Sequence, residues 1–328
     1  MNRRSFLSAA LCATGTSLLD PLAHALPPPH SSRPILDAHV HLFDPTRPGG
    51  IPWPEPSDLI YRPALPNRLQ TLAAPLGVVG AIAIEASPLA SDNDWLLRTV
   101  EHNRFMVGFI GDLVPGSSGF RADLDRLHRS PLFLGIRYGN LWNRDLAADL
   151  APSHPNPGFL ADLRALAQAG LTFESANPNP ALISALLAVA QHIPELRMVI
   201  DHLPHAQLPT DAAVLQVYNA HLRELAQHTN VFIKLSEILS PHPGETQASS
   251  TPYLAQLDPL WSLFGPDRIL FGSDWPNSDH IASYSETLAV AQDFIAQRAP
   301  ASAHDVFFST SQRAFRWQPR LASQQARA

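Results

Sequence analysis

The order of apolar and helical segments along the chain limits its fold more than any other feature of the sequence. Eight short apolar runs alternate with stretches of helical periodicity from Ile35 onward. Near-continuous apolar strands indicate a parallel sheet covered on both faces, and eight β/α units close a barrel. We therefore predict an α/β fold, a single TIM (β/α)8 barrel. The predicted strands are residues 35–41, 80–86, 105–113, 133–138, 171–175, 198–202, 231–236 and 269–274.

The segments between these runs have the periodicity of helices. Helices are predicted at residues 92–103, 119–129, 158–170, 180–193, 211–229 and 251–264. An open, doubly wound sheet is the alternative fold. It is disfavoured because that fold binds phosphate on a glycine-rich loop after its first strand, whereas this first strand ends in His39, Val40 and His41.

Residues 1–25 have the features of a twin-arginine signal peptide. Arg3 and Arg4 precede a short apolar stretch and then Ala23-His24-Ala25, a small-x-small cleavage site. The stretch is too short and too polar in its middle to span a bilayer, so no stable membrane anchor is expected. We expect export by the twin-arginine machinery into the periplasm or the medium.

The rest of the chain divides into three parts. Residues 26–34 are predicted to form an extended tether, residues 35–318 the barrel and residues 319–328 a C-terminal tail. Cys12, in the signal peptide, is the only cysteine. A mature chain would therefore have no disulfide and no thiolate ligand, which leaves His, Asp and Glu to bind any metal.

The charge balance limits the class of partner. The net charge of −6 provides no basic field, so we expect neither nucleic acid nor an anionic membrane surface as a partner. A small-molecule substrate fits better. The sequence leaves open whether the chain forms an oligomer.

The first predicted strand carries a His-x-His pair. His39 and His41 are two residues apart, so they face the same side of the strand, with Ala38 and Val40 opposite. Two imidazoles on one face suit a divalent metal such as zinc. A pair of hydrogen-bonded surface histidines is the alternative, but the carboxyl ends of barrel strands are where TIM barrels place their active sites.

Two further strands end in ionisable residues. Asp274 ends the eighth predicted strand and His202 the sixth. Beside a metal, Asp274 would be a ligand and would accept a proton from an attacking water, and His202 would complete a His-His-His-Asp site. The structural alternatives are a turn aspartate and a buried core histidine.

Other charged residues are predicted to lie at or in the barrel mouth. Arg137 on the fourth strand suits a substrate carboxylate or a developing oxyanion. Lys234 on the seventh strand needs a charged partner, because an unpaired lysine inside a barrel is costly. Glu85 and Glu174 are the candidate partners, or further metal ligands.

An unusually long connection, from Leu42 to Gly77, follows the first strand. Loops of this length usually carry function, and a first βα loop lies at the active-site rim of a barrel. Tyr61 and Arg62 within it are candidate substrate contacts; a loop that merely covers the barrel mouth is the alternative.

Five motifs together resemble the amidohydrolase-related group of the amidohydrolase superfamily, which includes fuconolactonases and pyrone-dicarboxylate lactonases. They span residues 37–45, 134–138, 199–203, 230–236 and 270–276. The resemblance implies a TIM barrel that hydrolyses a cyclic ester, with a site formed by His39, His41, His202 and Asp274. It makes Asp274 the proton-transfer group, aided by His202. It implies a divalent metal, with zinc expected, although members of the group differ in whether they need one.

Two residues depart from the group's pattern and leave the substrate open. Glu85 stands where many relatives carry an amide, which makes it a further candidate metal ligand, and Glu237 stands where a glycine is common. The predicted substrate contacts are Tyr61, Arg62, Arg137, Lys234 and Trp275. A metal-assisted decarboxylase and a catalytically idle barrel that binds a sugar acid are the alternative functions.

Overall fold

The computed structural model describes residues 33–139, 141–150, 158–176, 179–206, 208–240 and 249–325. The predicted signal peptide, nearly all of the predicted tether and the last three residues lie outside the described residues. Eight parallel strands follow one another in the order β1 to β8. They are β1 (Ile35–His41), β2 (Val78–Ile84), β3 (Met106–Gly111), β4 (Phe133–Arg137), β5 (Thr172–Ser175), β6 (Arg197–Ile200), β7 (Val231–Leu235) and β8 (Ile269–Phe271).

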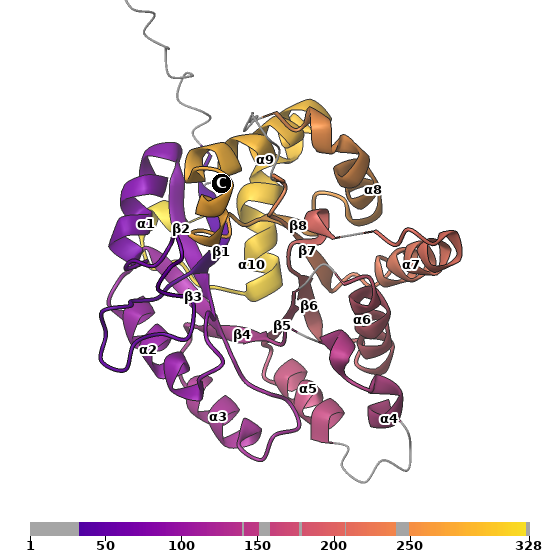
Figure 1. Cartoon of the computed structure of the whole chain (residues 1–328), viewed down its shortest axis with the longest axis horizontal. Coiled ribbons are helices and arrows are strands. Elements are labelled where there is room, and N and C mark those ends of the chain that lie inside the picture. The colour runs from indigo at the N-terminus through magenta and orange to yellow at the C-terminus, as the bar shows by residue number, and fades with distance from the viewer. Residues whose placement is uncertain are drawn as a thin grey trace, which may run out of the picture. The chain divides into compact units, whose positions relative to one another are not determined.

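The sheet closes on itself between β1 and the residues that follow β8. Val40 forms a parallel bridge with Trp275, the amide of His41 donates to the carbonyl of Trp275, and the amide of Asp274 donates to the carbonyl of His39. The strands thus form a (β/α)8 barrel with helices around it (Figure 1), and the predicted TIM-barrel fold is confirmed.

Helices separate successive strands around the barrel (Figure 1). They are α1 (Pro66–Ala73), α2 (Ala90–Glu101), α3 (Phe120–Leu127), α4 (Leu146–Leu150), α5 (Gly158–Gln168), α6 (Ala181–His192), α7 (Ala212–Leu225), α8 (Leu254–Phe264), α9 (Tyr284–Arg298) and α10 (Thr310–Phe315). All six predicted helices are present. Among the described residues, none of the helices has the length and apolar character that crossing a membrane requires.

Six of the eight predicted strands extend one to three residues beyond the observed ones, and three of these differences bear directly on the site. The sixth, seventh and eighth strands end at Ile200, Leu235 and Phe271, before the polar residues assigned to them. The physical reason is a turn in the backbone: His202 and Asp274 adopt φ values of 53° and 60°, which no strand residue can have. The polar side chains therefore project from turns just beyond the strands.

Two apolar clusters line the two faces of the barrel wall. Strand residues alternate between them, as Ala81 and Ile82 of β2 do, and the larger cluster includes the helices that cover the sheet from outside. The smaller cluster therefore fills the barrel interior. Ala38 packs in this interior cluster and Val40 in the outer one, so the predicted placement of both residues on one face is wrong; the pairing of β1 with β2 shifts register between them.

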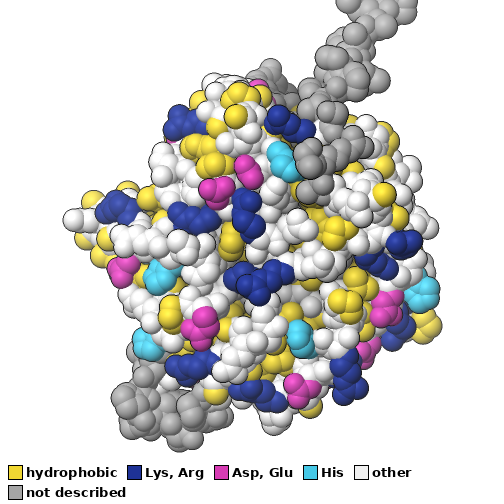
Figure 2. Space-filling view, turned by 180° about the vertical axis from the view of Figure 1, so that it is seen from behind, with side chains coloured by type: hydrophobic (Ala, Val, Ile, Leu, Met, Phe, Trp, Pro, Cys, Tyr) yellow, Lys and Arg dark blue, Asp and Glu magenta, His cyan; other side chains and the backbone are white. Residues whose placement is uncertain are grey.

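The end of the described chain packs against the barrel. The buried amide of Gln324 donates to the carbonyls of Val79, Arg104 and Phe105, and the guanidinium of Arg320 donates to four carbonyls between the end of α2 and the start of β3. This part of the predicted tail is ordered. Figure 2 shows one face of the molecule, on which arginine side chains are spread out, with Asp and Glu among them.

Candidate active site

A cavity of about 650 Å³ opens at the carboxyl ends of the strands. This is where parallel barrels place catalytic groups, and the volume suits a small molecule. Its walls come from the ends of most strands and from the long first connection. The lining residues are His41, Trp53, Glu85, Ala86, Ser87, Pro88, Asp112, Val114, Arg137, Tyr138, Gly139, Ala176, His202, Glu237, Asp274 and Asn277.

His39, His41 and Asp274 meet at the floor of this cavity. The Oδ1 atom of Asp274 lies 3.2 Å from Nε2 of His41 and 3.4 Å from Nε2 of His39, and the two Nε2 atoms are 3.2 Å apart. All three residues are buried. The structure thus brings together the residues that the sequence placed on the first and last strands.

His202 joins this group from the turn after β6. Its ring lies 4.5 Å from that of His39, and its Nε2 atom lies 4.0 Å from Oδ1 of Asp274. The hydroxyl of Ser236 holds the opposite ring nitrogen, Nδ1, at 2.9 Å. Four predicted site residues therefore form one cluster, and Ser236 orients the fourth.

Backbone strain is concentrated at this cluster. Among the described residues, four that are not glycine have positive φ, and three of them are His202, Glu237 and Asp274. Side chains other than glycine adopt this region at a cost of about 1–3 kcal/mol each, and such residues gather at functional sites. The amide of Asn277 links two of the three, donating to Oδ2 of Asp274 at 2.6 Å and to Oε1 of Glu237 at 3.4 Å.

The charges of the cluster follow from burial and close contacts. Burial would raise the pKa of Asp274, but His202, His41 and His39 hold it well below its ordinary value. Burial and the ammonium of Lys234 lower the pKa of His39 well below its ordinary value. Asp274 is therefore an ionised acceptor and His39 a neutral imidazole, the forms that bind a metal or accept a proton.

The residues fit a divalent cation. Nδ1 of His41 lies 3.2 Å from the carbonyl oxygen of Ile84; when it donates there, a neutral His41 presents an unprotonated Nε2 to the carboxylate of Asp274. Oδ1 of Asp274 is buried and has no hydrogen-bond partner among the described residues. Imidazole nitrogens and a carboxylate oxygen converging in this way are the donor set of hydrolytic zinc sites.

A buried ionic layer lies directly beneath the cluster. Nζ of Lys234 lies 2.7 Å from Oε1 of Glu174, 2.9 Å from Oδ1 of Asp201 and 3.0 Å from Nδ1 of His39, and all four residues are fully enclosed. Burial and the neighbouring Asp201 raise the pKa of Glu174. Burial would raise the pKa of Asp201 too, but Lys234 and His39 lower it. The predicted pairing of Lys234 with Glu174 is present.

Four of the five predicted substrate contacts lie elsewhere. Lys234 is enclosed by its partners and Trp275 is fully buried beneath the guanidinium of Arg68, so neither lines the cavity. Arg62 points to solvent and pairs with Asp279, and Tyr61 beside it is not part of the cavity wall. These four residues, as the structure places them, do not reach the substrate space.

Arg137 and Glu85 do line the cavity, but they bind each other. Nε of Arg137 donates to Oε1 of Glu85 at 2.6 Å, and the other carboxylate oxygen accepts from the amide of Ser87 at 3.1 Å. Glu85 belongs to none of the groups of converging ligand atoms among the described residues. The structure therefore gives Glu85 a partner in Arg137 in place of a metal.

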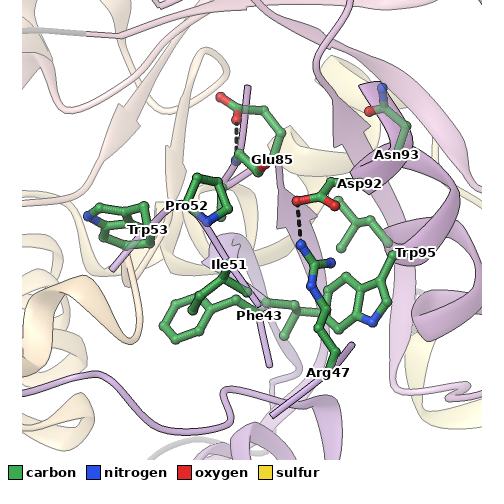
Figure 3. Close-up of a pocket in the computed structure, with 13 residues that line it drawn as sticks. Phe43, Arg47, Ile51, Pro52, Trp53, Glu85, Asp92, Asn93 and Trp95 are labelled. Carbon is green, nitrogen blue, oxygen red and sulfur yellow. Dashed lines mark hydrogen bonds and ion pairs between the residues drawn. The ribbon is translucent and has the colours of Figure 1, made fainter. Parts of the chain in front are cut away.

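The long first connection supplies a wall of the cavity. Trp53 packs edge-on against His41 and Phe43, with ring centres 5.6 and 5.4 Å away. The guanidinium of Arg47 binds Asp92 of α2 at 2.6 Å and lies over the ring of Trp95 (Figure 3). These contacts fix the connection to α2 and hold the indole of Trp53 at the edge of the site.

The fold and the site define a class of protein: barrel enzymes whose chemistry is carried by histidine and aspartate at the carboxyl ends of the strands. The chain belongs to the amidohydrolase family, whose model, described as Amidohydrolase, matches residues 36–317. The resemblance inferred from the motifs is confirmed, and the protein is a hydrolase of this family.

Individual proteins are similar to this chain in sequence or in fold. An L-fucono-1,5-lactonase of Burkholderia ambifaria is 31% identical over 263 residues, covering 77% of this chain and 85% of the relative. A zinc-bound amidohydrolase structure from Burkholderia multivorans has a TM-score of 0.72 at 20% identity, covering 87% of this chain and all of that one. A probable 2-pyrone-4,6-dicarboxylic acid hydrolase from Acinetobacter baumannii, with citric acid bound, has a TM-score of 0.66 at 17% identity, covering 86% of this chain and 99% of that one.

Proposed function

We propose that the protein is a lactonase that opens the cyclic ester of a sugar acid by attack of an activated water on the ring carbonyl. The observation that carries the proposal is the convergence of His39, His41, His202 and Asp274 at the cavity floor. The similarity to an L-fucono-1,5-lactonase over most of both chains supports this substrate class.

The chain's own residues can carry the proton transfers. Asp274, ionised and fully enclosed, would accept a proton from the attacking water and return it to the ring oxygen as the ester opens. His202, oriented by Ser236, would donate to the carbonyl oxygen as negative charge develops there. Asn277 fixes the carboxylate of Asp274 from the other side. A divalent cation held by the histidines and Asp274 would supply polarisation of the carbonyl and a lowered pKa of water.

Purified protein should release acid from simple sugar lactones. In a weakly buffered solution at constant pH, we expect consumption of base above the uncatalysed rate with aldono-1,4- or aldono-1,5-lactones, because each ring opening produces one carboxylic acid. The absence of acid release across a broad lactone panel would contradict the proposal. Release of carbon dioxide without ring opening would instead indicate a decarboxylase.

We propose zinc as the metal, supported by the nitrogen and oxygen donor set and by the zinc in the Burkholderia multivorans amidohydrolase. After loading with zinc and dialysis, we expect about one zinc per chain by atomic emission. His41→Ala should lose most of it, because this imidazole faces Asp274 directly. His128→Ala removes an exposed histidine and serves as the matched control. Equal zinc retention in the two variants would refute the assignment.

A further inference from the structure

The only guanidinium on the cavity wall, among the described residues, is already bound to a carboxylate. Arg137 donates from Nε to Oε1 of Glu85 at 2.6 Å and from Nη2 to the backbone carbonyl of the same residue at 2.8 Å. Its third nitrogen, Nη1, lies 3.8 Å from Oδ2 of Asp201. The side chains are only 14% and 18% exposed, so the pair is shielded from water and held strongly.

The charges around Arg137 leave it no excess of positive potential. Four carboxylate residues line the cavity, Glu85, Asp112, Glu237 and Asp274, against this single arginine. Burial would lower the pKa of Arg137, but Glu85 and Asp201 raise it, so the guanidinium stays charged. The carboxylates of these two residues compensate its positive charge. A substrate carboxylate entering the cavity would meet like charges and no free cationic side chain of the wall.

The same carboxylates suit a different ligand chemistry. Carboxylate oxygens accept hydrogen bonds from hydroxyl groups, and a sugar ring carries several hydroxyls and no charge. The indole of Trp53, which also lines the cavity, provides an apolar face on which a ring can lie. The cavity therefore combines acceptors and an aromatic surface.

We propose that Glu85 determines specificity: by neutralising Arg137 it restricts the site to uncharged, polyhydroxylated lactones and excludes lactones that carry a carboxylate. The proposal rests on the lactonase function proposed above. The two residues act as one unit, in which Arg137 would bind a substrate carboxylate if Glu85 did not occupy it.

The test compares two substrates that differ at one carbon, glucono-1,4-lactone with a hydroxymethyl group and glucaro-1,4-lactone with a carboxylate. Glu85→Gln removes the negative charge while its amide oxygen can still accept from Ser87. We expect kcat/KM for glucaro-1,4-lactone, relative to glucono-1,4-lactone, to rise by about tenfold or more. Glu85→Ala, which frees Nε of Arg137 completely, should shift the ratio in the same direction, and melting curves establish that each variant is folded.

Two comparison variants separate the ion pair from the general charge of the cavity. Asp112→Asn removes one negative charge from the same wall but leaves Arg137 bound to Glu85, so it should shift the ratio far less. In Glu85→Gln with Arg137→Ala the gain should disappear. An equal shift in Asp112→Asn, or a gain that survives the loss of Arg137, would overturn the proposal.

Binding of the open-chain product provides a readout that needs no turnover. By calorimetry, glucarate should bind Glu85→Gln about tenfold more tightly than it binds the wild type, while gluconate binding changes little. If the wild type hydrolyses no lactone and the variant still gains glucarate binding, the lactonase function fails and the specificity role stands. If the wild type is an active lactonase and Glu85→Gln changes neither the kcat/KM ratio of the two lactones nor the affinity for glucarate, only the specificity role is refuted.

Discussion

Replacing Asp274 by asparagine should reduce kcat for lactone hydrolysis by about 10³-fold or more. The carboxylate is the one ionised acceptor within 4.0 Å of all three site histidines, and its Oδ1 atom has no hydrogen-bond partner among the described residues. An amide has the same shape but cannot take a proton from water. It also binds a cation less strongly than a carboxylate does. The measurement is acid release at saturating lactone.

The matched control for this variant is Asp279→Asn, five residues further along the chain. Asp279 pairs with Arg68 and Arg62 at 3.5 and 3.8 Å and is not part of the cavity wall. We expect its kcat to stay within about twofold of the wild type, because Asp279 does not line the cavity and its ion pairs are partly exposed. Retention of substantial activity by folded Asp274→Asn would exclude Asp274 as the proton-transfer group.

The barrel could be predicted from the sequence because its signal is repeated. Each strand is a run of apolar residues, and errors at one strand do not affect the count of eight. The ends of β6 and β8 were predicted two and three residues too far along, because the left-handed turns are at His202 and Asp274 themselves and neither position is a glycine. The register shift in β1, which separates Ala38 from Val40, likewise has no marker, because residues 35–41 include no glycine or proline.

The cluster of histidines with Asp274 was predictable because polar residues stand out at the ends of apolar strands. The residues that surround this cluster could not be predicted in the same way. Asp201 precedes His202 in the sequence and was passed over, although its position two residues after Val199, which faces the interior, places it inside the barrel. Trp53 lies in an irregular connection, where no periodicity indicates which side chain reaches the cavity.

Three of the predicted substrate contacts lie away from the cavity for a common physical reason. A charged or aromatic residue near the rim is a candidate ligand contact only if the fold leaves it unpaired. Lys234 and Arg62 each have carboxylate partners supplied by distant parts of the chain, and Trp275 is covered by Arg68. Such long-range pairings are set by the closed barrel and cannot be read from local spacing.

Lys234→Met should lower the free energy of unfolding by about 3–5 kcal/mol. Lys234 is the only lysine in the sequence, and its ammonium contacts two fully buried carboxylates, Glu174 at 2.7 Å and Asp201 at 2.9 Å. Methionine retains the length and apolar stem of lysine but leaves both carboxylates without their main counter-charge. Urea unfolding at neutral pH measures the loss.

Two further variants test whether this loss comes from the uncompensated charges. Adding Asp201→Asn to Lys234→Met removes the carboxylate whose pKa Lys234 lowers, so the double variant should be more stable than Lys234→Met alone, a non-additivity expected only of groups in contact. Arg298→Met breaks an exposed ion pair, with Asp258 at 3.5 Å, and should cost less than about 1 kcal/mol. A similar small cost for Lys234→Met would mean that something other than the lysine stabilises the carboxylates beneath the active site.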